Sequence, residues 1–190
     1  MEAFLVSTGI VALAEMGDKT QLLSLLLAAR FRRPLPIILG ILAATLANHA
    51  AAGAIGAWLT QYVGEDVMRW VLGASFIAMA VWMLIPDKLD KDESDSCRLG
   101  VFGTTLVAFF LAEMGDKTQV ATVALAAQYS AFLAVVAGTT LGMMLANVPA
   151  VLLGDKVTRM VPIKTIHAIA ALIFVALGLM ALFDVGLPGR

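Results

Sequence analysis

The sequence is poor in charged residues. Asp, Glu, Lys and Arg make up only 14% of the 190 residues, whereas soluble domains carry roughly 25%. Hydrophobic residues reach 61%, and the mean hydropathy is +0.91. A soluble domain of this length does not need so much apolar material to fill its core. The composition therefore excludes an ordinary soluble domain and predicts an integral membrane protein.

Cysteine is nearly absent. The single Cys97 lies in a polar segment, which excludes an intramolecular disulfide and a thiolate metal cluster. A basic segment is also missing before the first apolar run, which starts near Phe4 and contains Glu15. We therefore expect a retained membrane span rather than a cleaved signal peptide, with no targeting extension.

Six apolar stretches are long enough to cross a bilayer, which takes about 20 residues of helix. This pattern predicts an all-α polytopic membrane protein with six transmembrane helices. The approximate ranges of the expected spans are 4–29, 35–60, 67–85, 101–128, 131–153 and 165–183.

The basic residues are distributed unevenly among the breaks between these stretches. Nine of the 13 Lys and Arg residues fall in the first, third and fifth breaks, and the even-numbered breaks and the two ends hold only Arg69 and Arg190. Basic loops stay on the cytoplasmic side. The distribution predicts cytoplasmic odd-numbered breaks and two termini on the opposite, outer side of the membrane.

A charged heptad occurs twice. Residues 15–21 read Glu-Met-Gly-Asp-Lys-Thr-Gln, and residues 113–119 repeat all seven letters 98 positions later. We expect a first three-helix repeat at 1–85, a cytoplasmic linker at 86–100 and a second three-helix repeat at 101–190. Because three crossings per repeat invert the second copy, the two heptads would approach the bilayer midplane from opposite faces, as in inverted-repeat transporters.

The heptads place ionisable groups in apolar surroundings, where such groups are functional candidates by default. On an ideal helix, Glu15, Asp18 and Lys19 share one face, as do their counterparts in the second heptad. The glycine inside each heptad allows close helix approach or local unwinding. Six unpaired charges at mid-bilayer would cost on the order of 15 to 20 kcal/mol, so we expect them to face each other or water.

The charges of the two heptads fit a divalent cation. Four carboxylates and two ammonium groups sum to −2 when all are ionised. Oxygen ligands of this kind suit Ca²⁺, Mn²⁺ or Mg²⁺ rather than copper or structural zinc. Because clustered carboxylates repel one another, they can take up protons when the cation leaves. The predicted ligands are Glu15, Asp18, Glu113 and Asp116, supported by Lys19, Thr20, Gln21, Lys117, Thr118 and Gln119.

The duplicated pattern Glu-x-Gly-Asp-Lys/Arg-Thr/Ser resembles the GDT family of Ca²⁺/Mn²⁺:H⁺ antiporters over the whole chain, and both copies match it fully. The resemblance implies a cation site at the four heptad carboxylates. It also implies a transporter rather than an enzyme, with no cofactor and with Mn²⁺ or Ca²⁺ as the transported substrate. The short chain, without an N-terminal extension, is more similar to the bacterial manganese exporters of that family.

For several other polar and sulfur-bearing residues, two alternative roles are open. Asn48 and Asn147 either hydrogen-bond between helices or reach the cation. Met16 and Met114 either fill gaps between helices or act as softer ligands that favour Mn²⁺. His49 either packs in the core or relays protons, and His167 is expected at the membrane interface.

The function predicted from the sequence is export of a divalent cation, Mn²⁺ first and Ca²⁺ second, in exchange for protons. The predicted partners are the cation, protons and the lipid bilayer, without nucleic acid and with no oligomeric state assigned. A passive cation channel with the same acidic site is the first alternative. An intramembrane aspartyl protease is the second, because Gly17-Asp18 and Gly115-Asp116 resemble its Gly-Asp signature.

Overall fold

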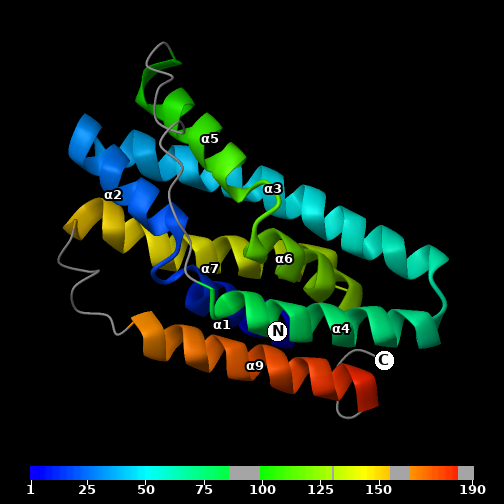
Figure 1. The fold of residues 1–190 in the computed structure, drawn as a ribbon. Coiled ribbons are helices and arrows are strands. Elements are labelled where there is room, and N and C mark those ends of the chain that lie inside the picture. Colours follow the sequence, from blue (N-terminus) through cyan, green and yellow to red (C-terminus); the bar gives the residue numbers. More distant parts are fainter. Residues whose placement is uncertain (86–98, 130, 155–162, 184–190) are drawn as a thin grey trace.

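The computed structural model describes residues 1–85, 99–129, 131–154 and 163–183, and these residues form an all-helical bundle (Figure 1). The expected linker 86–100 lies almost entirely outside the described residues, as do Cys97, Lys156 and Arg159. The helices are α1 (Glu2–Glu15), α2 (Lys19–Phe31), α3 (Pro34–Tyr62), α4 (Glu65–Met83), α5 (Gly100–Glu113), α6 (Lys117–Gln128), α7 (Phe132–Leu153) and α9 (Ile163–Phe183).

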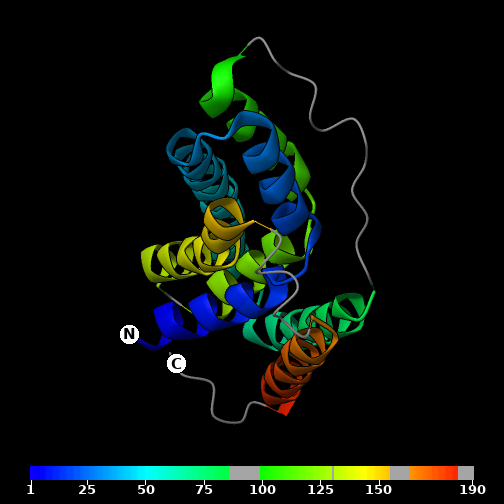
Figure 2. The ribbon, with the colours of Figure 1, turned by 90° about the vertical axis from the view of Figure 1, so that its left-hand side faces the viewer.

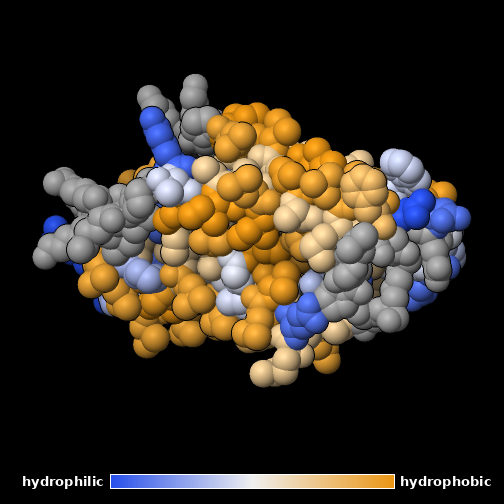
Figure 3. Space-filling view, turned by 90° about the horizontal axis from the view of Figure 1, so that it is seen from below, coloured by the Kyte–Doolittle hydropathy of each residue, from blue (hydrophilic) through white to orange (hydrophobic). Residues whose placement is uncertain are grey.

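Four of these helices are long and apolar enough to cross a membrane. They cover Pro34–Tyr62, Asp66–Met83, Phe132–Leu153 and Lys164–Phe183, which agrees closely with four of the ranges expected from the sequence. The exterior is largely apolar, as the face seen from below shows (Figure 3). The chain is therefore a multi-pass membrane protein.

The other two expected spans, 4–29 and 101–128, are each broken in the middle. The first is divided into α1 and α2 and the second into α5 and α6, with the break at Met-Gly-Asp of each heptad. The expectation that each heptad lies on one face of a continuous helix is therefore wrong. The cause is the glycine, which adopts positive φ, 84° at Gly17 and 80° at Gly115, a conformation that interrupts a right-handed helix.

The two breaks have nearly the same backbone conformation. Met16 and Met114 are extended, with φ, ψ of −64°, 114° and −66°, 115°. Asp18 and Asp116 then begin the next helix with −81°, 171° and −82°, 170°. The identical heptad thus folds into the same local structure twice.

Each heptad glutamine closes its own break. Gln21 Oε1 accepts a hydrogen bond from Gly17 N at 2.9 Å, and Gln119 Oε1 accepts one from Gly115 N at 2.6 Å. These bonds satisfy a backbone N–H that the interrupted helix leaves without a carbonyl partner. The glutamines therefore support the backbone turn.

The two halves of the chain pack across each other. The broken helix α1–α2 contacts α7 of the second half, and the broken helix α5–α6 contacts α3 of the first half. The last helices of the halves, α4 and α9, pack side by side (Figures 1 and 2). Each heptad is consequently held by a long helix from the other half.

Two glycines related by the 98-residue offset make these crossed contacts close. A Cβ atom at Gly138 of α7 would lie 2.5 Å from the Phe4 carbonyl oxygen of α1, and one at Gly40 of α3 would lie 2.9 Å from the Phe102 carbonyl oxygen of α5. Phe4 and Phe102 are themselves 98 positions apart. Small residues at such crossings let helix backbones approach one another.

Replacing Gly138 by Ala should destabilise the protein by about 1 to 3 kcal/mol, because the new methyl group overlaps a backbone oxygen that cannot move aside. The matched control is Gly9→Ala in α1, where a Cβ would meet nothing within 4 Å. The control should leave the thermal unfolding midpoint in detergent unchanged or slightly raised. Equal midpoints for the two variants would contradict the close α1–α7 crossing.

Replacing Gly115 by Ala tests the break itself. A Cβ there meets no atom within 4 Å, so the only cost is the positive φ of 80°. We expect a loss of about 1 to 2 kcal/mol in unfolding free energy. Gly115→Asn should lose less, since Asn tolerates positive φ. Two variants of equal stability would argue against the left-handed turn.

Candidate metal centre

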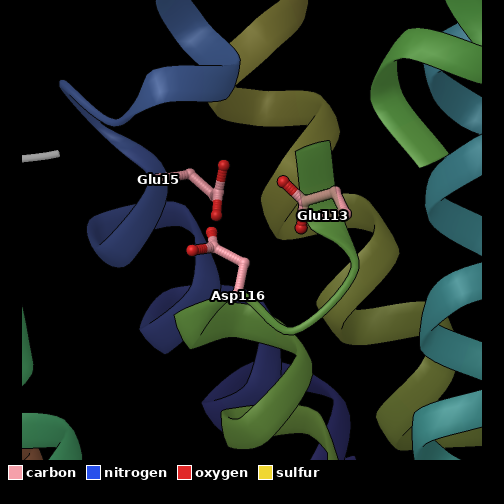
Figure 4. Close-up of side chains that lie close together, drawn as sticks. All are labelled: Glu15, Glu113 and Asp116. Carbon is pink, nitrogen blue, oxygen red and sulfur yellow. The ribbon is translucent and has the colours of Figure 1, made fainter. Parts of the chain in front are cut away.

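Three heptad carboxylates meet in the interior of the bundle (Figure 4). Glu15 ends α1, Glu113 ends α5 and Asp116 is the N-cap residue just before α6. All three are buried, and one oxygen from each lies within 4.8 Å of the others. Because helix ends converge here, side chains from both heptads reach one point.

A threonine of the same heptad orients each glutamate. Thr20 Oγ1 donates to Glu15 Oε2 at 2.5 Å, and Thr118 Oγ1 donates to Glu113 Oε2 at 2.8 Å. The other oxygens, Glu15 Oε1 and Glu113 Oε1, are buried and accept no hydrogen bond from the part of the chain that the structure describes. A buried carboxylate oxygen without a donor is costly. A cation or a proton at this point would remove that cost.

The two aspartates have different surroundings. Asp18 Oδ1 accepts a hydrogen bond from Lys19 N at 2.7 Å and so caps α2, and Asp18 is not among the three clustered ligand groups. Asp116 makes no such cap bond to α6 and joins the cluster. The structure thus brings together three of the four carboxylates expected at the site and places Asp18 beside them as a helix cap.

The motif lysines make contacts outside their own heptad. Lys19 Nζ lies 3.4 Å from Asp116 Oδ1, so this ion pair joins the two heptads, in place of the pairing with Glu15 that a continuous helix would allow. Lys117 is 1% exposed and its Nζ donates to the Ile85 carbonyl, just after α4, at 3.4 Å. Each lysine therefore ties its heptad to another segment.

The two asparagines hydrogen-bond to neighbouring helices. Asn48 Nδ2 of α3 donates to the Phe110 carbonyl of α5 at 3.1 Å, and Asn147 Oδ1 of α7 accepts from Ser24 Oγ of α2 at 2.7 Å. Near Asn147, Gln21 Nε2 donates to the Ala146 carbonyl at 3.0 Å. The interhelical reading of both asparagines agrees with these contacts.

The two methionines differ in exposure. Met114 is 56% exposed, so most of its side chain does not fill a gap between helices. Met16 is half-buried, and its carbonyl has the more specific role. His167 Nε2 of α9 lies 2.7 Å from the Met16 carbonyl oxygen. A carbonyl only accepts, so the ring nitrogen must carry the proton.

The role of His167 could not be found by comparing the repeats, because position 69, 98 residues earlier, is Arg. The expectation that His167 lies at the membrane interface missed this contact with the heptad. His49, by contrast, is fully buried in α3, and neither ring nitrogen has a hydrogen-bond partner among the described residues.

Comparison with known proteins agrees with this duplicated site. The chain matches the family described as "Divalent cation/proton antiporter GDT1" in two segments, residues 3–91 and 101–187. These segments correspond closely to the two halves that carry the heptads.

Two relatives match this chain over more than nine tenths of their own length. A Vibrio cholerae protein named "Putative manganese exporter" is 52% identical over 184 residues, which cover 96% of this chain and 92% of that protein. A GDT1-like protein of Synechocystis is 28% identical, covering 92% of this chain and 93% of its own. No solved structure matches. The chain therefore belongs to the GDT1 family of divalent cation/proton antiporters.

Proposed function

We propose that this protein exports a divalent cation, Mn²⁺ first and Ca²⁺ second, in exchange for protons, at a site built from both heptads. The observation that carries the proposal is the buried cluster of Glu15, Glu113 and Asp116, with ligand oxygens within 4.8 Å of one another. Carboxylate oxygens at this spacing suit a hard divalent cation. Asp18, Thr20, Gln21, Thr118 and Gln119 support the cluster through the backbone and the glutamates.

The charge of the cluster favours exchange. Three ionised carboxylates and the ammonium group of Lys19 carry a net charge of −2, which one divalent cation neutralises. When the cation leaves, repulsion between the carboxylates favours protonation. The same oxygens thus bind cation and protons alternately, and this competition couples the two movements.

The proposed topology has six crossings in two inverted three-helix repeats, 1–85 and 101–190, joined by a cytoplasmic segment at 86–100. It is supported by the matching breaks, by the crossed packing of each broken helix, and by the paired contacts of Gly40 and Gly138. The positions of the basic residues favour periplasmic termini in a bacterial inner membrane.

Alternating access then follows from the packing. Each broken helix moves with the long helix of the other half against which it packs, so rocking of one such unit against the other exposes the cluster to one side at a time.

The choice of Mn²⁺ as the first cation is supported by the Vibrio cholerae relative, whose name assigns manganese.

Reconstitution in liposomes with an internal pH dye tests the exchange. An imposed Mn²⁺ gradient should drive proton movement in the wild type. Glu15→Gln and Glu113→Gln should each reduce the rate more than tenfold, since each removes a charged ligand that also binds the proton. The matched control is Glu2→Gln, an exposed carboxylate at the start of α1, which should keep the wild-type rate.

Two outcomes would overturn the proposal. Cation flux without proton movement would indicate a channel. Exchange that is indifferent to both glutamate substitutions would remove the cluster from the transport pathway. Substituting Ca²⁺ for Mn²⁺ in the same vesicles gives the order of preference as a ratio of rates.

Lys19→Gln should increase the affinity for Mn²⁺ about tenfold. Lys19 competes with the cation for Asp116, at 3.4 Å, and removing a like charge at this range is favourable by a few kcal/mol before compensation. Isothermal titration of the detergent-purified protein measures the dissociation constant, with exposed Arg33→Gln as the control. A weaker or unchanged affinity would show that Lys19 supports the site instead of competing with its substrate.

A further inference from the structure

A groove of about 420 Å³ runs between α4 and α9. Its lining residues are all apolar and include Ile77, Val81, Leu84, Ala168, Leu172 and Val175. Several of them, such as Val81 and Leu172, are among the exposed large hydrophobic residues of the chain. The groove therefore opens sideways, toward the surroundings of the bundle.

The lining determines what the groove can accept. With apolar side chains alone on its walls, it offers no ligand to a cation and no hydrogen bond to a polar molecule. Apolar surface in contact with a flexible hydrocarbon chain is favourable through dispersion and close packing. In a membrane protein, the hydrocarbon chain available to such a groove is a lipid acyl chain.

A basic residue continues the groove at one end. Lys164, Ala168, Ala171 and Val175 follow one another at spacings of four, three and four residues, so they share one face of α9. Lys164 is exposed in the first turn of the helix, and no salt bridge to it is found among the described residues. A cation at the end of an apolar groove, next to a positive helix terminus, is complementary to a phosphate.

The same end of the groove is connected to both heptads. His167, beside the lining residue Ala168, donates to the Met16 carbonyl at 2.7 Å. Ile85, beside the lining residue Leu84, accepts from Lys117 at 3.4 Å. A molecule bound between α4 and α9 would therefore fix the spacing of the two helices. The contacts of His167 and Ile85 with the heptad breaks depend on that spacing.

We propose that the α4–α9 groove is a binding site for one anionic phospholipid, with an acyl chain along the apolar walls and the phosphate at Lys164. Occupancy sets the spacing of α4 and α9 and so the position of the two breaks. The consequence for transport rests on the exchange proposed above, whereas binding of the lipid does not.

Native mass spectrometry of the detergent-purified protein tests the binding. Phosphatidylglycerol and phosphatidylcholine with identical acyl chains are titrated separately, so that only the headgroup differs. The wild type should retain one phosphatidylglycerol about fivefold more tightly than phosphatidylcholine, as expected for one lysine near an anionic headgroup. Lys164→Gln should abolish this preference, and Arg33→Gln, which removes an exposed charge elsewhere, should keep it.

A second pair of variants tests the apolar walls. Ala168→Phe places a ring in the groove and should reduce retention of both lipids. Leu179→Phe puts the same ring on an exposed part of α9 outside the lining and should have no effect. Both positions are exposed, so neither change disturbs the core.

Three results would overturn the proposal. These are equal retention of the two lipids by the wild type, a headgroup preference that survives Lys164→Gln, and a dimer that Ala168→Phe dissociates. The last result would show that a second copy covers the groove. Lipid retention is measured from the mass of the complex and does not depend on proton-coupled transport. A failure of this proposal is therefore distinguishable from a failure of the proposed exchange.

The transport consequence is measured separately in liposomes of either lipid. Mn²⁺-driven proton movement should be faster in phosphatidylglycerol, and Lys164→Gln should remove that difference while leaving a measurable rate. A wild-type rate that is the same in both lipids, with specific retention intact, would limit the groove to a structural lipid site.

Discussion

The structure depends on keeping three carboxylates inside an apolar bundle. Glu15, Glu113 and Asp116 cannot each find a full set of donors within one continuous helix, because a helix uses its own N–H groups internally. Breaking two helices at the same place solves this problem: it moves the carboxylates to helix ends and positions one threonine against each glutamate. The remaining oxygens, Glu15 Oε1 and Glu113 Oε1, are buried and accept no hydrogen bond from the described residues. The site is thus a consequence of backbone interruption, and the glycine of each heptad makes the interruption possible.

Much of the fold could be predicted from the sequence because hydrophobic length is a strong constraint in a membrane. Four of the expected ranges correspond to single helices within a few residues. The spans 4–29 and 101–128 were expected as continuous helices because apolar residues flank the charged heptad closely on both sides. Gly17 and Gly115 signalled possible unwinding, yet glycine is common in membrane helices, and only the structure shows the positive φ.

The sequence predicts which residues belong to the candidate site better than it predicts how they are arranged. An exact repeat of a charged heptad identifies Glu15, Glu113 and Asp116 as a group, since unpaired charges must find each other. The pattern does not distinguish Asp116 from Asp18, because the two have the same neighbours in sequence and differ only in what the other half brings close. The partner of Lys19 and the contact of His167 with Met16 are likewise set by packing between halves, which no periodicity within one half encodes.

The crossed packing has a consequence for assembly. The first broken helix is synthesised well before α7, the long helix against which it packs. It is also synthesised before the segment that carries Glu113 and Asp116, the residues that meet Glu15 and Lys19. The first half on its own lacks α5, α6 and α7, helices of the other half against which its own helices pack. Joining the two halves in one chain fixes their equal number, which two separate chains would have to achieve by chance.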